Sequence, residues 1–349
     1  MKTAIIIVTY NAEKWLDLCL GSCRRFAKEV PVIVVDNNSS DNTVEYIKKN
    51  YSEVVVLPQA DNTGFAKGNN IGIKYALAHA AESVFLLNPD AEICEQTLEK
   101  CHQVLFSDDK LAAVQPIILL PSKLVNSVGN SFHYLGLAEA GGNDLPLEIA
   151  KEVVPHLKNK TEPGYLSGAA MMIKTEVIKC LGGFDEFLFI YHEDAELCWR
   201  FRLAGWKLGV VSEAVAIHHY EFSRSIARIY YMERNRFLVW LSLLKWPTLV
   251  LLILPVFFSE AMLLAWSLMT GSFFKRIKIY NYLLTREAGD YIISKRQAIK
   301  KIRQLSDREF LSFASATIES KNVQSFMTTF VFNPVSKLAW KIIYPLIRW

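Results

Sequence analysis

Four short apolar runs rich in β-branched residues recur in the first quarter of the chain, separated by more polar, helix-like stretches. The runs cover residues 5–8, 32–35, 54–57 and 84–87. Apolar strands that alternate with helices form a parallel sheet covered on both faces, so this pattern predicts an α/β fold. Asn42, with Glu45 three residues later, predicts a capping box at the start of the helix after the second strand.

The stretch from residue 164 to about 219 continues the same pattern. It predicts strands at 165–173, 207–211 and 215–218, around a helix from Glu193 to Ala204 that Gly205 ends. We expect these elements to complete one domain over residues 1–236, with halves at 1–110 and 111–236. Residues 237–349 are expected to form a separate, helical region.

The excess of apolar residues lies after residue 236, and it raises the hydrophobic content of the chain to 51%. Residues 248–269 have about the length of a membrane span, but Glu260 lies near their middle, where a charge costs on the order of 3 kcal/mol. Basic flanks and the basic, aromatic segment 337–349 favour helices that lie in a membrane interface or re-enter it. The alternative for 337–349 is a helix packed on the domain.

Charge and cysteine usage exclude several classes of protein. A net charge of +4 with no RNA-binding aromatic signature argues against a nucleic-acid partner. Six cysteines without a CxxC pair predict reduced, mostly packed thiols. The apolar run after Met1 is too short for a signal peptide and continues into Thr9, so it predicts a first strand.

Polar clusters follow the predicted strands at the edge where ligands bind in open α/β sheets. The clusters are Thr9-Tyr10-Asn11, Asp36-Asn37-Asn38 and Asn88-Pro89-Asp90. The Asp90 carboxylate suits Mg²⁺ or Mn²⁺, although an Asp after Pro is equally well explained by a turn.

Further candidates lie in the second half of the predicted domain. Glu193 and Asp194 open a helix whose dipole keeps a carboxylate ionised and available as a base; for an isolated helix, an ordinary acidic first turn is the simpler interpretation. His218 and His219 end a strand, where an imidazole could join a metal site or form surface hydrogen bonds.

Taken in order, the motifs resemble family 2 glycosyltransferases with the GT-A fold, especially the rhamnosyltransferase-like branch. Residues 62–72 contain three glycines but lack the GxGxxG spacing of a dinucleotide-binding loop, so as evidence for dinucleotide binding they are weak. The same stretch does fit this glycosyltransferase family. The resemblance spans about residues 3 to 236 and rests on Ile7–Asn11, Val34–Thr43, Asn62–Gly72, Leu87–Asp90, Gly182–Glu186 and Tyr191–Arg200.

The resemblance implies an inverting, metal-dependent glycosyltransferase. Asp194 matches the catalytic base, and Glu193 would orient the acceptor or the base. Residues 1–110 would bind the nucleotide of a UDP- or dTDP-sugar, with Asp36 on the pyrimidine, and 111–236 would face the acceptor. The implied nucleotide site is Thr9, Tyr10, Asn11, Asp36, Asn38, Lys67 and Asn88; the implied metal site is Asp90, His218 and His219.

One departure and several alternatives stay open. Asn88 stands where many relatives have a first Asp, which leaves the identity of the metal, Mg²⁺ or Mn²⁺, undecided. The candidates for acceptor or phosphate contacts are Asp185, Arg224 and Arg234. Our first expectation is transfer of rhamnose from dTDP-rhamnose to a lipid-linked or polysaccharide acceptor at the cytoplasmic face of the inner membrane. A hexosyl- or galactofuranosyltransferase that uses a UDP-sugar and, less favoured, a non-catalytic glycan-binding scaffold remain alternatives.

Overall fold

The computed structural model describes residues 2–156, 162–220, 229–319 and 325–349. The chain divides into two compact units. Unit 1 comprises residues 1–130, 140–201 and 206–221, and unit 2 comprises 131–139, 202–205 and 222–349. Helix α9 (Ile229–Leu243) therefore belongs to unit 2 and crosses the boundary expected at residue 236.

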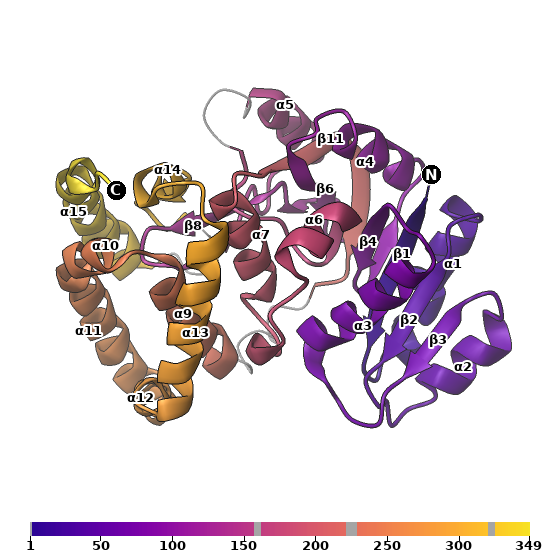
Figure 1. Ribbon diagram of the computed structural model, residues 1–349, viewed down its shortest axis with the longest axis horizontal. Helices are drawn as coiled ribbons and strands as arrows, with labels where there is room; N and C mark the ends of the chain where they lie inside the picture. Colours follow the sequence, from indigo (N-terminus) through magenta and orange to yellow (C-terminus); the bar gives the residue numbers. More distant parts are fainter. Residues whose placement is uncertain (1, 157–161, 221–228, 320–324) are drawn as a thin grey trace. The chain divides into compact units, whose positions relative to one another are not determined.

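Unit 1 is built on a nine-stranded mixed sheet (Figure 1). Its strand order is β3-β2-β1-β4-β10-β6-β11-β5, with β7 paired to β6. The strands are β1 (Thr3–Thr9), β2 (Val32–Asp36), β3 (Val55–Pro58), β4 (Ser83–Leu87), β5 (Ala91–Ile93), β6 (Leu111–Leu119), β7 (Val125–Ser127), β10 (Ala170–Lys174) and β11 (Lys207–His218). Strands β1 to β4 pair in parallel as predicted, whereas β10 runs antiparallel between β4 and β6.

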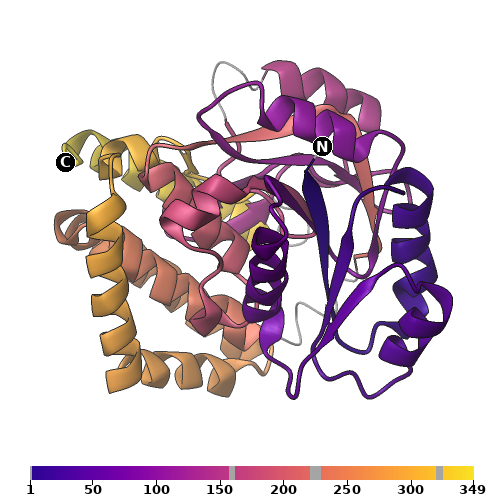
Figure 2. The same cartoon turned by 45° about the vertical axis from the view of Figure 1, so that its right-hand side comes forward.

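Helices cover both faces of this sheet, which confirms the predicted α/β architecture. Helices α1 (Leu16–Phe26) and α3 (Gly64–Ala78) lie on opposite faces of the sheet (Figures 1 and 2). Ile5 and Ile7 of β1 pack with α1, and Ile6 and Val8 face α3, because alternate side chains of a strand point to opposite sides. The helices are η1 (Glu13–Trp15), α1 (Leu16–Phe26), α2 (Thr43–Asn50), α3 (Gly64–Ala78), α4 (Thr97–Leu105), α5 (Leu147–His156), α6 (Thr175–Leu181), η3 (Glu186–Leu188) and α7 (Glu193–Leu203).

Three local expectations are corrected by the structure. The strand predicted at 165–173 begins only at Ala170, and the two predicted at 207–218 form one strand, β11, with an irregularity between Val211 and Val215. Asn42 is the N-cap of α2 but makes no side-chain capping bond. Asp41 instead accepts from the backbone N–H of Thr43 at 3.1 Å, which replaces the predicted capping box.

Unit 2 is mainly helical, with helices coloured orange to yellow in Figure 2. Phe132 stacks on Phe310 at 5.3 Å, and Trp240 packs against both rings. Besides α9, its elements are β8 (Asn130–His133), β9 (Ala138–Ala140), α10 (Trp246–Leu251), α11 (Ile253–Met269), α12 (Phe273–Leu283), α13 (Arg286–Ile302), α14 (Asp307–Leu311), β12 (Ala314–Ser315), η4 (Met327–Phe332), α15 (Asn333–Ile343) and η5 (Tyr344–Leu346).

The apolar segment 248–269 is divided between α10 and α11. Glu260, which interrupts the apolar run, is an internal ion-pair partner: it accepts from Arg236 at 2.7 Å and from Arg276 at 3.1 Å. Across the described parts of the chain, no helix combines the length and the apolar character that a membrane crossing needs.

Candidate active site

The loops that follow β1 and β2 are tied together by one buried carboxylate. Asp36 is 1% exposed. Its Oδ1 accepts from the hydroxyls of Thr9 at 2.7 Å and Ser39 at 2.6 Å, and its Oδ2 accepts from the backbone N–H of Ser39 at 2.9 Å. Asp36 therefore fixes the shape of this edge, and at most one lone-pair direction remains for a ligand.

The outward-facing groups of this edge come from neighbouring residues. Asn11 adopts a left-handed conformation with φ of 52°, and its side-chain oxygen accepts from the backbone N–H of Ser40 at 2.8 Å. Asn38, with φ of 59°, is exposed, and Tyr10 is about half exposed. Tyr10, Asn11 and Asn38 are the predicted nucleotide residues that are exposed here.

Asn37 has a role that the sequence prediction missed. Its amide donates to the carbonyl of Gly64 at 3.0 Å, and its oxygen accepts from the hydroxyl of Thr63 at 2.8 Å. These bonds join the loop after β2 to the start of α3. The available signal was its position in the strand pattern: next to Asp36, it must point to the other side of the sheet.

The glycine-containing stretch 62–72 brings α3 close to β1. A Cβ atom added at Gly68 would lie 2.7 Å from the Val8 side chain, and one added at Gly72 would lie 2.5 Å from Ile6. Larger residues would push the helix off the strand. The glycines are thus explained by helix packing, and Lys67 lies exposed on the same helix.

Asp90 and His218 are brought together at the ends of β4 and β11. An Oδ atom of Asp90 lies 3.3 Å from Nε2 of His218, and Nδ2 of Asn88 lies 3.4 Å from the same nitrogen. Oδ1 of Asn88 is buried and has no hydrogen-bond partner among the described residues. Carboxylate, amide oxygen and imidazole together form a donor set that suits Mg²⁺ or Mn²⁺.

His219 does not join this group. Its Nε2 lies 3.0 Å from a carboxylate oxygen of Glu92, and its ring packs on Trp15 at 5.2 Å. Adjacent residues of an extended chain point to opposite sides, which separates the two predicted histidine ligands. Within the described ranges, no cluster of three or more His, Cys, Asp or Glu side chains could hold a metal ion by itself.

Asp194 is connected to this group through two consecutive residues. Its Oδ2 accepts from the backbone N–H of Gly168 at 3.1 Å, and its Oδ1 accepts from the N–H of Ala195 at 2.8 Å. The carbonyl of Ala169, the next residue after Gly168, accepts from the N–H of Asn88 at 2.9 Å. The carboxylate at the start of α7 and the Asn88–Asp90 turn therefore share one support.

Glu193 and Asp194 form a pair of acidic residues with unequal environments. Burial raises the pKa of Glu193 well above its ordinary value, and the neighbouring Asp194 charge raises it further. Burial also raises the pKa of Asp194, against the backbone N–H groups of Gly168, Ala195 and Asp194 itself, which favour its ionised form. Burial therefore disfavours a charge on both acids, and the N–H groups around Asp194 oppose this effect.

Comparison with known proteins places the chain in a family. The Glycosyl transferase family 2 model matches residues 4–181, about half of the chain. The chain belongs to this family. Its relatives include the low-salt glycan biosynthesis hexosyltransferase Agl10 of Haloferax volcanii, which is 29% identical over 67% of this chain and 74% of that protein.

Two rhamnosyltransferases are also among the relatives. The N-acetylglucosaminyl-diphospho-decaprenol L-rhamnosyltransferase of Mycobacterium tuberculosis is 26% identical over 62% of this chain and 75% of its own length. The dTDP-rhamnosyl transferase RfbF of Shigella flexneri is 24% identical over 67% of this chain and 78% of its own. These similarities confirm a glycosyltransferase that resembles the rhamnosyltransferase branch.

Among solved structures, the mannosyltransferase PcManGT of Pyrobaculum calidifontis, in complex with GDP-Man and Mn²⁺, has a TM-score of 0.51. It is 14% identical, with 86% of this chain and 85% of that chain covered. A likeness at this level of identity supports the GT-A-like fold of the glycosyltransferase.

The start of α7 in this glycosyltransferase follows a strained segment. Phe189, Tyr191 and His192 all have positive φ, at 65°, 67° and 66°. The carbonyl of Phe189 accepts from the N–H of Phe65 at 2.9 Å, at the start of α3. Strain of this kind persists only where the surroundings impose it, and it is concentrated at functional sites.

The loop at 182–186 is held by an arginine that the sequence prediction did not select. Arg200 forms a buried ion pair with Glu196 at 2.9 Å and donates to the carbonyl of Gly183 at 2.6 Å. Asp185, a predicted acceptor contact, accepts from the N–H of Phe187 at 3.1 Å and is the N-cap of η3; its contact with an acceptor stays a prediction.

The other two predicted contact residues are not placed in this site. Arg224 lies outside the described residues. Arg234 lies on α9 of unit 2, where its Nε donates to the side-chain oxygen of Asn235 at 2.9 Å. Its guanidinium also lies over the ring of Tyr231 at 5.2 Å.

Proposed function

We propose that the protein transfers a sugar, rhamnose from dTDP-rhamnose in the first instance, to a lipid-linked or polysaccharide acceptor during cell-surface glycan synthesis. The observation that carries this proposal is the shared support of Asp194 and the Asn88–Asp90 turn on Gly168 and Ala169. This support favours the proposal because it holds the proposed base and the proposed diphosphate-binding group on one edge of the sheet. The names of the two rhamnosyltransferase relatives favour this donor.

In the proposed reaction, the acceptor hydroxyl attacks the anomeric carbon from the side opposite to the diphosphate. The new carbon–oxygen bond forms as the bond to the diphosphate breaks, so the configuration is inverted. Asp194 takes the proton of the hydroxyl, and the nucleoside diphosphate leaves with the bonding electron pair. Burial and the Asp194 charge raise the pKa of Glu193, which disfavours a second negative charge beside the attacking oxygen.

A divalent cation, Mg²⁺ or Mn²⁺, would neutralise charge on the leaving diphosphate when bound. Asp90 and His218 would hold it, with the buried oxygen of Asn88 as a further donor. The diphosphate and water would supply the remaining coordination positions, because two or three protein donors do not complete the shell of such an ion.

The nucleotide would bind at the β1 and β2 ends. Tyr10 and Asn38 are exposed there, while Thr9 and Asn11 help to fix the two loops. We propose that Asp36 receives the N3–H of a thymine or uracil base through its remaining lone pair, as expected for a dTDP or UDP donor. Lys67 is positioned on the exposed side of α3 and is the proposed contact for a donor phosphate.

We further propose that the enzyme works at the cytoplasmic face of the inner membrane, peripherally, where a lipid-linked acceptor is found. The name of the mycobacterial relative, which includes a diphospho-decaprenol, favours this acceptor class. A hexosyl- or galactofuranosyltransferase that uses a UDP-sugar is the second candidate, favoured by the hexosyltransferase relative.

The test measures nucleotide release from dTDP-, UDP- and GDP-sugars with Mn²⁺ or Mg²⁺. Asp194→Asn and Asp90→Ala are compared with Asp109→Asn, an exposed acid of unit 1. We expect metal-dependent release from dTDP-rhamnose that both site variants lose and the control retains. Release from a UDP-hexose alone would select the second candidate. If calorimetry detects no binding of dTDP or UDP, the transferase proposal fails and a scaffold role takes its place.

A further inference from the structure

Helix α11 exposes a continuous apolar stripe. Leu254 is 78% exposed and Phe257 73%, and Ala261, Ala265 and Leu268 follow on the same side at intervals of three or four residues. The spacing is that of one helix face. A stripe of this kind on the outside of a unit costs free energy in water and marks a surface that is covered by a partner.

The opposite side of α11 is fixed to unit 2. Ser259 and Ser267 are buried, and Glu260 accepts hydrogen bonds from Arg236, Arg276 and the hydroxyl of Tyr280. Removing α11 from this position would leave charged groups without their partners, at high cost. The stripe is therefore presented outward by a helix that is held by its polar side.

A second stripe runs along α15 and continues into η5. Val335, Leu338 and Ile342 of α15 and Leu346 of η5 are exposed at intervals of three or four residues. The inner side of the helix packs through Trp340, whose ring stacks on Tyr134 at 4.4 Å. The sequence analysis placed the aromatic segment 337–349 at a membrane interface. In the structure, Trp340 of this segment is turned inward, and aliphatic residues take the outer side of the helix.

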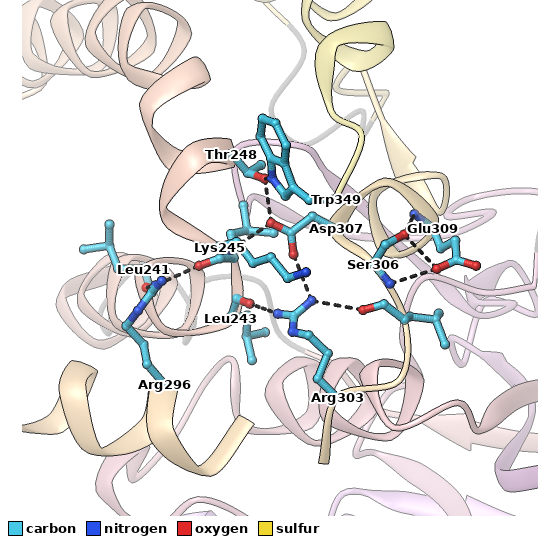
Figure 3. Close-up of polar contacts among 12 residues, drawn as sticks. Leu241, Leu243, Lys245, Thr248, Arg296, Arg303, Ser306, Asp307, Glu309 and Trp349 are labelled. Carbon is cyan, nitrogen blue, oxygen red and sulfur yellow. Dashed lines mark hydrogen bonds and ion pairs between the residues drawn. The ribbon is translucent and has the colours of Figure 1, made fainter. Parts of the chain in front are cut away.

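One polar cluster anchors the ends of both stripes (Figure 3). The buried Asp307 accepts from the hydroxyl of Thr248 on α10 at 2.6 Å and from Arg303 at 2.8 Å, and its backbone N–H donates to the carbonyl of Trp349 at 2.8 Å. The indole N–H of Trp349 donates to the same Thr248 hydroxyl at 2.7 Å. Helix α10, which precedes α11, and the segment after α15 therefore meet at this cluster.

The charge of the same part of the chain is strongly positive. Residues 222–349 contain nineteen Lys and Arg against seven Asp and Glu, whereas residues 1–221 contain twenty against twenty-eight. Three of the seven acids, Glu233, Glu260 and Asp307, accept from arginines inside unit 2. Lys337 and Lys341 are exposed beside the α15 stripe. Two copies of this chain joined through these faces would bring like charges together, whereas an anionic surface would be attracted.

We propose that the α11 and α15 stripes form a docking surface for the headgroup region of an anionic lipid bilayer. Apolar side chains enter the boundary of the acyl region, and the flanking lysines contact lipid phosphates. This inference rests on the proposed function only for the reason why the protein would bind a membrane: a lipid-linked acceptor is presented at the membrane surface. The surface itself follows from exposure, helix spacing and charge.

The test is co-sedimentation of the full chain with vesicles, without donor or acceptor. One set contains phosphatidylglycerol and phosphatidylethanolamine in equal parts, and the other contains phosphatidylcholine alone. We expect binding to the anionic set that weakens with added salt. The double variant Leu254→Glu/Phe257→Glu should lower the partition coefficient at least about tenfold. The double variant Lys337→Gln/Lys341→Gln should also lower the partition coefficient, by about fivefold for each lysine removed, and only on the anionic vesicles.

Matched controls carry the same chemical changes on unit 1. Ile149→Glu introduces an acid at an exposed apolar position of α5, and Lys48→Gln/Lys49→Gln removes two exposed charges from α2. Both controls should bind vesicles like the unaltered chain. Nucleotide binding by calorimetry verifies that every variant is folded.

Three results would overturn the docking surface. The first is that the unaltered chain binds neither vesicle set. The second is that the control variants on unit 1 lose as much vesicle binding as the variants of α11 and α15. The third is a dimer in analytical ultracentrifugation that Leu254→Glu/Phe257→Glu abolishes while vesicles stay unbound, which would make the face a contact between copies. Vesicle binding without sugar transfer would defeat the proposed function and leave the surface standing. Sugar transfer to a soluble acceptor without vesicle binding would defeat the docking surface and leave the sugar-transfer activity standing.

Discussion

Asn126 and His218 are joined by a contact of 3.1 Å between the amide oxygen and Nδ1 of the imidazole. An amide oxygen can only accept, so Nδ1 carries the hydrogen and Nε2 faces Asp90. As a metal ligand, Nε2 would share a cation with the Asp90 carboxylate. Asn126, on β7, therefore selects the tautomer that a metal ligand needs.

Asn126→Ala should weaken Mn²⁺ binding by about tenfold to a hundredfold, because His218 loses the partner that fixes its ring. Asn126→Asp keeps an acceptor oxygen and should bind Mn²⁺ at least as tightly as the unaltered protein. Electron paramagnetic resonance of free Mn²⁺, in the presence of dTDP or UDP, measures both. Equal affinities in all three proteins would show that Asn126 does not position the ligand.

Asp194→Asn should reduce sugar transfer by about a hundredfold to ten-thousandfold, the usual contribution of a general base. Nucleotide affinity in calorimetry should change little, since the substitution leaves the β1 and β2 ends intact. The raised pKa of Asp194 gives a second readout: kcat should fall as the pH drops through a value above the ordinary Asp range, because the base must be ionised. If kcat falls only at the pH of an ordinary Asp carboxyl group, or if Asp194→Asn turns over normally, Asp194 is not the base.

Strands β1, β2 and β4 of unit 1 could be predicted because they are buried along their whole length and appear as continuous apolar runs. The side on which a residue points was harder to predict. His218 and His219 looked equivalent in the sequence, yet strand geometry sends one to Asp90 and the other to Glu92. The role of Asn37 could have been inferred from the same alternation.

Other features depended on contacts between distant segments. Asp41, rather than the Asn42 side chain, caps α2, although both residues have suitable side chains. Arg200 reaches back to the carbonyls of residues 181–183, and no spacing rule predicts that contact. Glu260 looked like an interruption of an apolar helix because its partner Arg276 lies on the next helix.

The buried His133 should make stability depend on pH. Burial lowers its pKa to about 3 from 6.5, so the unfolded chain binds a proton between these values and the folded chain does not. The free energy of unfolding should therefore fall as the pH drops from 6.5 towards 3, by on the order of 4 kcal/mol for this group, and stay constant above 6.5.

Urea unfolding at a series of pH values measures this dependence. The slope between pH 4 and pH 6, where the unfolded histidine holds a proton and the folded one does not, should be smaller in His133→Gln than in the unaltered protein. His79→Gln, at an exposed position of unit 1, should keep the original slope. The comparison uses slopes, so a lower overall stability of His133→Gln does not affect it. If the free energy of unfolding depends on pH with the same slope in all three proteins, His133 is not the source of the pH dependence.

Arg200→Met should destabilise unit 1 by about 3 to 5 kcal/mol, because the fully buried Glu196 would lose the charge that compensates it. The carbonyls of residues 181–183 would lose a donor at the same time, which should loosen the loop next to α7. The double variant Glu196→Met/Arg200→Met should lose less than the sum of the two single variants. As a matched exposed pair, Arg24→Met, which breaks the contact with Glu53, should change stability little. Additive losses in the double variant would mean that the two side chains act independently, and the support of the 182–186 loop would then have to come from its own backbone.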